Sequence, residues 1–307
     1  MDENLVAGII LSIVSFCGVL TNLTVVLCQK RVLNLKQAFG SFTRNQAFGD
    51  AIQSVTVFFL VSPMSIFHID FLLEHSNLLS FATLLGYEIS VLSHVLLTVN
   101  RFCAVYAPIK YNRLFSERYS QCMMVVVNLY AALTCCFFYF YGCQYYWNSE
   151  EWVFMYHQSN QCDRVSFYGI FCKYLAIIVL VLLTDLVTAY KAGRLWRSLP
   201  NSQQQKSREV SFLVQVTLRL VRRRPLSPFP ICLQGVLFAT ELLAYFLVSP
   251  HIDNKWCRFL FTSFLFCFIH SCDGALSIFC NEDFRKFLSE LVVSRVNGNT
   301  DSQSRTV

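Results

Sequence analysis

The stretch Ser90–Tyr111, SVLSHVLLTVNRFCAVYAPIKY, decides the fold of this chain. Its apolar run stops at Asn100, Arg101 and Phe102, and a short aromatic and basic segment follows. An arginine costs about 2.5–3.5 kcal/mol at the centre of a bilayer but is tolerated at the interface. The pattern indicates a membrane-spanning helix that closes at Arg101. Arg101 is then either a topology anchor or a switch residue that faces a cytoplasmic partner, and this stretch alone leaves both interpretations open.

The composition is that of a polytopic membrane protein. Of the 307 residues, 55% are hydrophobic and only 14% are charged, whereas soluble domains carry about 25% charged residues. The net charge of +6 does not indicate nucleic-acid binding, because the basic residues lie in short loops. The 14 cysteines lie mostly inside apolar runs and lack zinc-site spacing. No metalloprotease, hydrolase or phosphate-loop motif is present, so we expect no enzyme.

Seven runs are long and apolar enough to cross a bilayer core of about 30 Å as helices. They are residues 5–28, 47–68, 78–100, 122–142, 167–190, 231–250 and 257–280. Because lipid offers the backbone no hydrogen-bond partner, these runs must be helical. We predict an all-α, seven-transmembrane domain over residues 1–290, with a short amphipathic helix around Phe284–Leu288. Residues 291–307 are predicted to be a disordered cytoplasmic tail.

The lysines and arginines orient the bundle. Seventeen of them lie in or at the ends of the loops after the first, third and fifth runs, and three lie on the opposite side. Because short cytoplasmic loops carry the excess of basic residues, we predict the N-terminus outside and the C-terminus inside. The first residues, MDENLVAGII, lack a basic region and a cleavage site, which favours a retained span over a signal peptide.

Five carboxylates lie in or at the ends of the runs, where an ionisable side chain normally faces the bundle interior. They are Asp50, Glu88, Asp185, Glu241 and Asp273. Asp50 and Asp273 are expected at similar depth, where both stay charged only with a shared proton or a bound cation such as Na⁺. Asn22 and Ser90 would complete this buried polar cluster. The alternative is that each side chain is hydrogen-bonded separately.

Other polar residues in the runs have simpler interpretations. Glu88 and Glu241 are candidates for a ligand pocket between the outer halves of the spans. His94 and His270 are lone histidines on apolar helices, which we interpret as hydrogen-bonded core residues. Pro63 is expected to kink the second span.

The loop after the fourth run is polar and aromatic and is predicted to lie outside. It contains Cys143 and Cys162, which form either a disulfide or two free thiols. Its exposed aromatic residues, among them Trp147 and Trp152, are either an interfacial belt or a lid over a ligand.

Four segments together carry a family resemblance. They are FTRNQAFGDAI (42–52), LTVNRFCAVYAPIKYNRLF (97–115), CLQGVLFATELLAYFLVSP (232–250) and HSCDGALSIFCNEDFRKFL (270–288). The chain resembles nematode chemoreceptors of the serpentine receptor class x family, a group of rhodopsin-like G-protein-coupled receptors, over residues 8–290. The resemblance implies a receptor that transmits the binding of an extracellular small molecule to a heterotrimeric G protein. It also implies the plasma membrane, in the cilia of sensory neurons.

The resemblance assigns roles to several residues. Arg101 matches the arginine that holds the inactive state and then contacts the G protein, but Asn100 replaces the usual acid before it. Asp50 matches the aspartate of the sodium site, with the asparagine and serine of that site at Asn22 and Ser90. Asp273-Gly274 stands where rhodopsin-like receptors have asparagine and proline.

Two departures from the family pattern stand out. No cysteine lies at the outer start of the third span, so the usual tether from the outer loop to that span cannot form, which leaves Cys143–Cys162 as the candidate disulfide. Residues 216–231 look inserted, and we interpret them as an artefact of the gene model, such as a translated intron.

The alternative hypothesis is a transporter or channel whose carboxylates line an ion path. Transporters tend to contain internal repeats and broken helices. The sequence shows no repeat, and the odd number of spans speaks against one.

The orientation is open to a direct test. An epitope tag at the N-terminus is expected to bind antibody on intact cells, and a tag at the C-terminus only after permeabilisation, because of the basic-residue asymmetry. Antibody labelling of intact and permeabilised cells measures this. A C-terminal tag that is accessible on intact cells would contradict the orientation.

Overall fold

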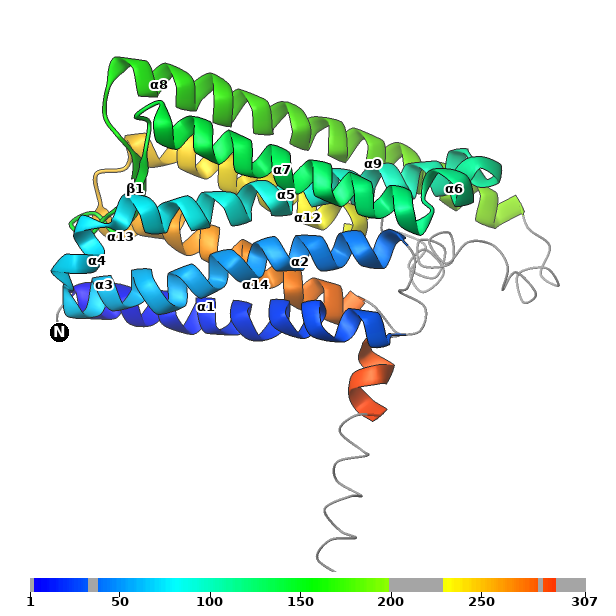
Figure 1. The fold of residues 1–307 in the computed structure, drawn as a ribbon, viewed down its shortest axis with the longest axis horizontal. Coiled ribbons are helices and arrows are strands. Elements are labelled where there is room, and N and C mark those ends of the chain that lie inside the picture. The colour runs from blue at the N-terminus through cyan, green and yellow to red at the C-terminus, as the bar shows by residue number, and fades with distance from the viewer. Residues whose placement is uncertain (1–2, 33–37, 199–228, 281–283, 291–307) are drawn as a thin grey trace, which may run out of the picture.

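The computed structural model describes residues 3–32, 38–198, 229–280 and 284–290. Long helices lie side by side in one bundle, with a small hairpin at the end where the first helix begins (Figure 1). Within these described ranges, seven helices are long and apolar enough to cross a membrane. The predicted all-α class and seven spans are therefore confirmed. The predicted tail, 291–307, lies outside the described residues. So does the predicted insertion, 216–231, except for residues 229–231, which begin the sixth span.

The spans follow one another along the chain, and most contain more than one helical segment. The first is α1 (Glu3–Cys28), followed by η1 (Gln29–Arg31), and the second is α2 (Ala38–Thr56), η3 (Val57–Val61) and α3 (Ser62–Phe67). After α4 (Asp70–Glu74), the third is α5 (Ser76–Tyr106), and after α6 (Pro108–Leu114), the fourth is α7 (Glu117–Phe140).

The fifth span is α8 (Asn160–Ser166), η4 (Phe167–Cys172) and α9 (Lys173–Ser198). The sixth is α12 (Phe229–Leu243), η6 (Ala244–Val248) and η7 (Ser249–His251). The seventh is α13 (Lys255–Phe259), η8 (Leu260–Phe264) and α14 (Leu265–Cys280). Residues 284–290 form a further short helix.

Several helices are longer than their predicted apolar runs. The second span begins at Ala38 and not at residue 47, and the third continues to Tyr106 and not to residue 100. The fifth extends from Asn160 to Ser198, where residues 167–190 were predicted. Hydropathy detects only the part of a helix that lies in hydrocarbon, whereas the backbone hydrogen bonds continue through the polar residues at each end. Arg101 therefore lies inside a helix and not at its end.

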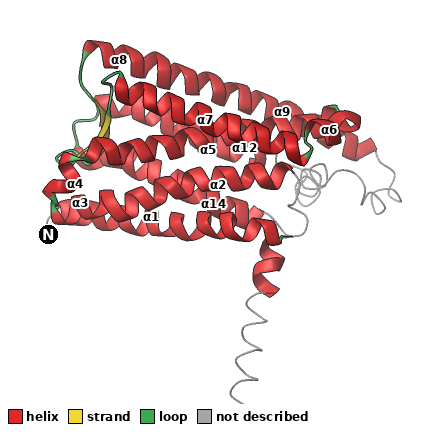
Figure 2. Cartoon of the chain, in the orientation of Figure 1, coloured by secondary structure: helices red, strands yellow, loops and turns green. Residues whose placement is uncertain are grey.

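The β-hairpin marks one end of the bundle, which we call the hairpin end; the opposite end is the Arg101 end. Strands β1 (Tyr145–Asn148) and β2 (Val153–Tyr156) pair antiparallel, with Tyr145 opposite Tyr156 and Asn148 opposite Val153. They are the yellow segment in Figure 2. The hairpin lies between the fourth and fifth spans in the sequence and packs against α5.

Four spans contain a π-helical segment in the half nearer the hairpin end. These segments are η3, η4, η6 and η8. Pro63, which was predicted to kink the second span, lies in the first turn of α3, directly after η3. A proline cannot donate a backbone hydrogen bond, and a widened turn relieves its clash with the preceding helix. Single π-helical turns recur at functional sites.

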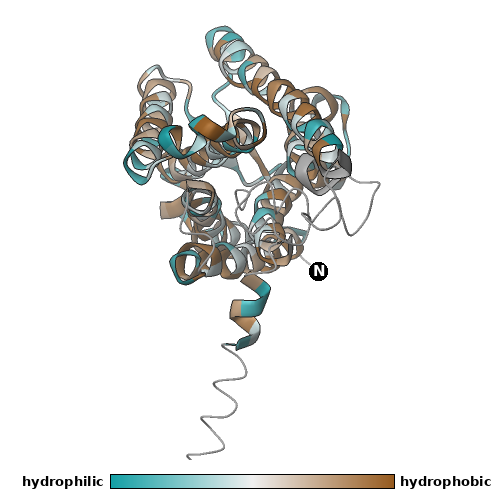
Figure 3. Ribbon diagram, turned by 90° about the vertical axis from the view of Figure 1, so that its right-hand side faces the viewer, coloured by the Kyte–Doolittle hydropathy of each residue, from teal (hydrophilic) through white to brown (hydrophobic). Residues whose placement is uncertain are grey.

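The outer surface of the bundle is apolar, as a lipid-facing surface requires. Large side chains such as Ile13, Leu133 and Phe140 are exposed, and hydrophobic residues are spread over all sides of the bundle in Figure 3. In the most apolar 18 residues of each span, the share of buried residues is highest in the third span, at 67%, and lowest in the fourth, at 17%. The third span therefore forms the centre of the bundle.

Glycines let two pairs of helices approach closely. A Cβ on Gly86 of α5 would lie 2.5 Å from the backbone oxygen of Gly49 in α2, and a Cβ on Gly49 would lie 2.6 Å from that of Gly86. A Cβ on Gly274 of α14 would lie 2.5 Å from Asn22 Oδ1 and 2.8 Å from the Asn22 backbone nitrogen. Small residues allow such backbone contact between helices in membranes.

The Gly86 contact predicts a cost for a single methyl group. Gly86→Ala is expected to lower the free energy of unfolding by about 1–3 kcal/mol, because the new Cβ meets backbone that cannot rotate away. The measurement is thermal unfolding of the purified protein in detergent. Gly193→Ala is the matched control, since a Cβ there meets nothing within 4 Å. Equal melting temperatures for the two variants would contradict the close contact.

Candidate ligand pocket, polar core and arginine switch

At the Arg101 end, Arg101 of α5 forms an ion pair with Asp185 of α9. Arg101 Nη2 lies 2.9 Å from Asp185 Oδ2, and Arg101 Nε lies 3.2 Å from Asp185 Oδ1. Arg101 Nη2 also donates to Thr98 Oγ1 at 3.1 Å. The Asp185 side chain is 1% exposed and that of Arg101 12%. Two parallel N–H···O bonds fix the guanidinium plane, so this pair ties the third span to the fifth.

The neighbours of Arg101 make their own contacts. Asn100 Nδ2 donates to the Tyr111 hydroxyl at 3.1 Å, and that hydroxyl lies 3.3 Å from Asn100 Oδ1. Tyr111 lies on α6, outside the spans, and burial raises the pKa of its hydroxyl, which therefore stays protonated at neutral pH. Phe102 stacks on Tyr106, with the ring centroids 4.4 Å apart. The three residues predicted as one switch thus face three different partners.

In the middle of the bundle, the structure brings Asp50, His270 and Asp273 together. His270 Nδ1 lies 2.7 Å from Asp50 Oδ1, and ligand atoms of the three residues lie within 4.8 Å of one another. All three are buried, with 0 to 2% of each residue exposed. Ser90 lies next to Asp50, and Asn22 Nδ2 donates to the His270 backbone oxygen at 3.0 Å. The four residues predicted as one polar cluster therefore lie around His270.

The oxygen atoms of this polar core fit a cation. Those without a hydrogen-bond partner among the described residues include Asn22 Oδ1, Asp50 Oδ2, Ser90 Oγ and both carboxylate oxygens of Asp273. Hard cations prefer carboxylate, carbonyl and hydroxyl oxygens of this kind. Because His270 already contacts Asp50, an ion would share this carboxylate with an imidazole. A proton shared among Asp50, His270 and Asp273 fits the same atoms.

A second ion pair joins the third and fifth spans nearer the hairpin end. Lys173 Nζ of α9 lies 2.6 Å from Glu88 Oε1 of α5, and Glu88 is fully buried. Lys173 Nζ also lies 4.3 Å from the centre of the Tyr174 ring. Glu88, a predicted pocket residue, is thus neutralised by a lysine and does not line the pocket.

A cavity lies among the third, fifth, sixth and seventh spans and the hairpin. Its lining is Leu84, Tyr87, Tyr145, Tyr156, Ile170, Tyr174, Glu241, Leu242, Tyr245, Phe246 and Phe266. Glu241, the second predicted pocket residue, is the one carboxylate in this lining. Tyr145 and Tyr156 come from the hairpin, outside the spans, and burial raises the pKa of each well above its usual value.

The hairpin is a lid over the hairpin end of the bundle, and its tryptophans are buried. Trp152 is fully buried and Trp147 is 3% exposed, so the interfacial-belt interpretation is wrong for these two residues. Trp152 Nε1 donates to Asn4 Oδ1 of α1 at 2.7 Å, and Lys255 Nζ lies 3.5 Å from the Trp152 ring centre. Trp152 also has a positive φ of 55°, a strained conformation that these contacts stabilise.

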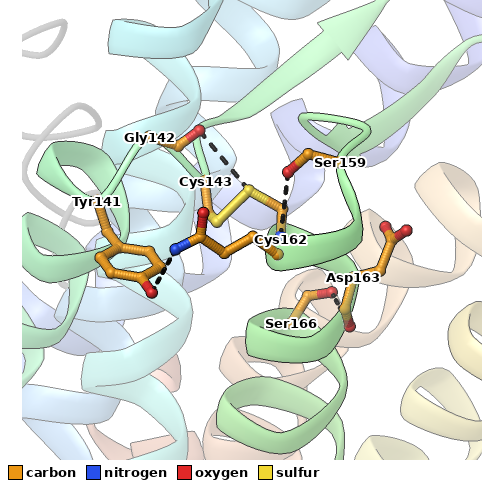
Figure 4. Close-up of a disulfide and its surroundings, with 8 residues drawn as sticks. Tyr141, Gly142, Cys143, Ser159, Cys162, Asp163 and Ser166 are labelled. Atoms are coloured by element: carbon orange, nitrogen blue, oxygen red, sulfur yellow. Dashed lines mark hydrogen bonds between the residues drawn. A yellow bond between two sulfur atoms is a disulfide. The ribbon is translucent and has the colours of Figure 1, made fainter.

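A disulfide joins Cys143 to Cys162 and closes the loop that carries the hairpin (Figure 4). Ser159 caps α8, since its Oγ accepts from the Cys162 backbone nitrogen at 3.1 Å. No cysteine of α5 takes part; instead Asn77 Nδ2 of α5 donates to Gln144 Oε1 at 2.9 Å. This hydrogen bond and the packing of β1 on α5 connect the loop to the third span.

Sequence reasoning missed the contacts of three residues of the candidate sites. Asp185 was recognised as an intramembrane carboxylate but not as the partner of Arg101, and Lys173 was not considered at all. His270 was interpreted as a lone core residue, although it stands three positions before Asp273, on the same helix face. That spacing was the available signal for His270, whereas no spacing links Asp185 to Arg101.

Comparisons with known proteins agree with this architecture. The model of the family "serpentine type 7TM GPCR chemoreceptor Srx" matches residues 13–281. Serpentine receptor class X 45 of Caenorhabditis elegans is 25% identical over 92% of this chain and 80% of its own length. Serpentine receptor class X-43 of the same organism is 25% identical over 94% and 87%. The crystal structure of squid rhodopsin matches with a TM-score of 0.69 at 16% identity, over 94% of this chain and 87% of that chain. The last likeness shows the fold.

The disulfide predicts a stability difference between two cysteine variants. Replacing both Cys143 and Cys162 by serine is expected to lower the free energy of unfolding by about 2–4 kcal/mol, because the open loop gains conformational freedom when unfolded. Thermal unfolding without reducing agent measures this. Cys257→Ser, which removes an exposed free thiol, is the control and should leave stability unchanged. A double variant as stable as this control would contradict the prediction.

Proposed function

The chain belongs to the Srx family of serpentine seven-transmembrane chemoreceptors, and on this premise we propose that it transmits the binding of an extracellular small molecule to a heterotrimeric G protein. Members of this family are multi-pass membrane receptors and not enzymes. The observation that carries the proposal is the buried Arg101–Asp185 pair at the end of the bundle opposite the lidded pocket. The hairpin end contains a cavity for a small molecule, and the opposite end contains an arginine whose charge is paired inside the bundle.

The described state is the inactive one. Arg101 forms hydrogen bonds to Asp185 and Thr98 and is therefore engaged inside the bundle. An activating ligand has to bind a second arrangement more tightly, one in which the third and fifth spans separate at this end. Arg101 then leaves Asp185 and contacts the G protein. The missing acid at Asn100 is thus replaced by an acid on another helix.

The surface for the G protein lies around Arg101 and the end of the fifth span. Lys191 Nζ lies 3.8 Å from the centre of the Tyr106 ring, and the Arg194 guanidinium lies 5.6 Å from that of Tyr190. The first contact holds Lys191 beside Tyr106 at the end of α5, and the second holds Arg194 beside Tyr190 of its own helix. Asn100 and Tyr111 fix α6 against the same end. A basic and aromatic surface of this kind complements an acidic partner.

The remaining features follow from the family. The N-terminus faces outward, the pocket is open to extracellular ligands, and the receptor acts in the plasma membrane of sensory cilia. The polar core around Asp50 and Asp273 holds a sodium ion or a shared proton, which stabilises one arrangement of the spans. The family match speaks against the transporter or channel hypothesis.

Asp185→Asn tests the switch without a known ligand. The substitution is expected to raise basal signalling several-fold, because Arg101 loses its charged partner and the inactive state loses its ion pair. Adding Arg101→Ala should abolish signalling while surface expression persists, since no unpaired charge is left buried. The measurement is a calcium or cyclic-nucleotide readout per receptor at the cell surface.

Asp253→Asn, an exposed carboxylate near the hairpin end, is the matched control and should signal as the parent does. If Asp185→Asn leaves basal signalling unchanged, or if the double variant still signals, Arg101 is a topology anchor and the proposed switch is wrong.

A further inference from the structure

We propose that the ligand of this pocket carries a positively charged amine, which Glu241 neutralises and the surrounding tyrosine rings enclose. The inference rests on the proposed receptor function and names the chemical class of ligand. It is argued from the contacts of Glu241, from the lining of the cavity and from the charges around it.

Glu241 is a buried acid whose partner is missing among the described residues. Only 6% of the residue is exposed, and its Oε2 makes no hydrogen bond. The nearest basic atom is His270 Nε2 at 3.8 Å, which is beyond hydrogen-bond distance. A buried carboxylate without a partner costs free energy. A cation that enters the cavity and pairs with Glu241 removes this cost, and its binding is strengthened accordingly.

Two basic residues of the neighbouring spans, Lys173 and Arg258, are already engaged in ion pairs. Lys173 pairs with Glu88 at 2.6 Å, and Arg258 pairs with Glu151 at 2.7 Å. His270 uses its other ring nitrogen on Asp50. Asp50 and Asp273 add two carboxyl groups next to His270. Three acids, Asp50, Asp273 and Glu241, therefore lie around one imidazole. The charge balance therefore favours a cation and disfavours an anion.

The walls of the cavity fit an organic cation. Five tyrosines, at positions 87, 145, 156, 174 and 245, line it together with Phe246 and Phe266. The faces of aromatic rings attract ammonium groups by about 0.5–2 kcal/mol each. The rings are held firmly: Tyr87 stacks on Phe266 at 5.9 Å and meets Tyr174 edge-on at 4.9 Å. Tyr245 donates to the Phe154 backbone oxygen at 2.9 Å.

The lining also excludes other ligand classes. A metal ion favours several carboxylate, imidazole or thiolate ligands, whereas this lining offers one carboxylate and otherwise neutral phenol hydroxyls. A carboxylic acid would face Glu241 and lack a basic partner. A neutral molecule would leave Glu241 without a counter-charge. The apolar walls formed by Leu84, Ile170 and Leu242 suit a small hydrocarbon or aromatic body attached to the ammonium group.

Three matched probes separate these classes. They are 2-phenylethylamine, 2-phenylethanol and phenylacetate, which share a phenyl ring and differ in charge at neutral pH. The full chain is placed in lipid nanodiscs, and the shift in its unfolding temperature with probe concentration gives each dissociation constant. We expect the amine to bind at least ten-fold more tightly than the alcohol, with phenylacetate weakest.

The variants assign that preference to Glu241. Glu241→Gln should reduce the amine-to-alcohol ratio to near one, and it should fold, because it removes a buried charge and keeps the shape. Glu150→Gln, an exposed acid of the hairpin loop, removes the same charge elsewhere and should keep the ratio.

The inference is overturned if the amine does not bind, if the alcohol or phenylacetate binds as tightly, or if Glu241→Gln retains the preference. These binding results do not depend on signalling. If amine selectivity fails while Asp185→Asn still raises basal signalling, the receptor function stands and the amine inference falls. If the amine binds selectively but neither the amine nor Asp185→Asn changes any G-protein readout, the receptor function falls instead.

Discussion

The interior of this bundle is governed by one constraint: a charge inside a bilayer must find its partner inside the protein. Arg101 pairs with Asp185, Lys173 with Glu88, and His270 lies against Asp50. Each contact joins two different spans. Two of the three connect α5 to α9, so the third span is fixed to the fifth at two depths. The third span, the most buried of the seven, therefore carries two of the three contacts.

The same constraint limits what the sequence alone could predict. Apolar runs of helical length reveal the seven spans, since each run reports its own transfer from water to lipid. Partners across the bundle depend on the rotation of each helix about its axis, which hydropathy does not fix. For this reason Asp185 was recognised as an intramembrane acid but was not paired with Arg101. Trp152 was assigned to an exposed loop because the polar residues around it hide the fact that the hairpin folds inward.

The two ends of the bundle differ in regularity. At the hairpin end, four spans contain π-helical segments, and an irregular lid with a left-handed Trp152 covers the cavity. At the Arg101 end, the second, third, fourth and fifth spans continue as α-helix past their predicted boundaries. Irregular backbone widens the space between spans and directs side chains into it. Regular helices act instead as rigid levers, which suits a signal read out as a shift of whole spans.

The His270 ring lies between the polar core and the pocket. Its Nδ1 lies 2.7 Å from Asp50 and its Nε2 lies 3.8 Å from Glu241. The ring is within hydrogen-bond distance of Asp50 but not of Glu241, so it does not satisfy the Glu241 carboxyl group in this arrangement. A cation bound at Glu241 stabilises that carboxylate without drawing the ring away from Asp50. Contact of this kind becomes coupling only if the spans have two arrangements that differ at both sites. In the proposed switch the Arg101–Asp185 pair is a discrete contact of that type, closed within the bundle in one arrangement and open to a partner in the other.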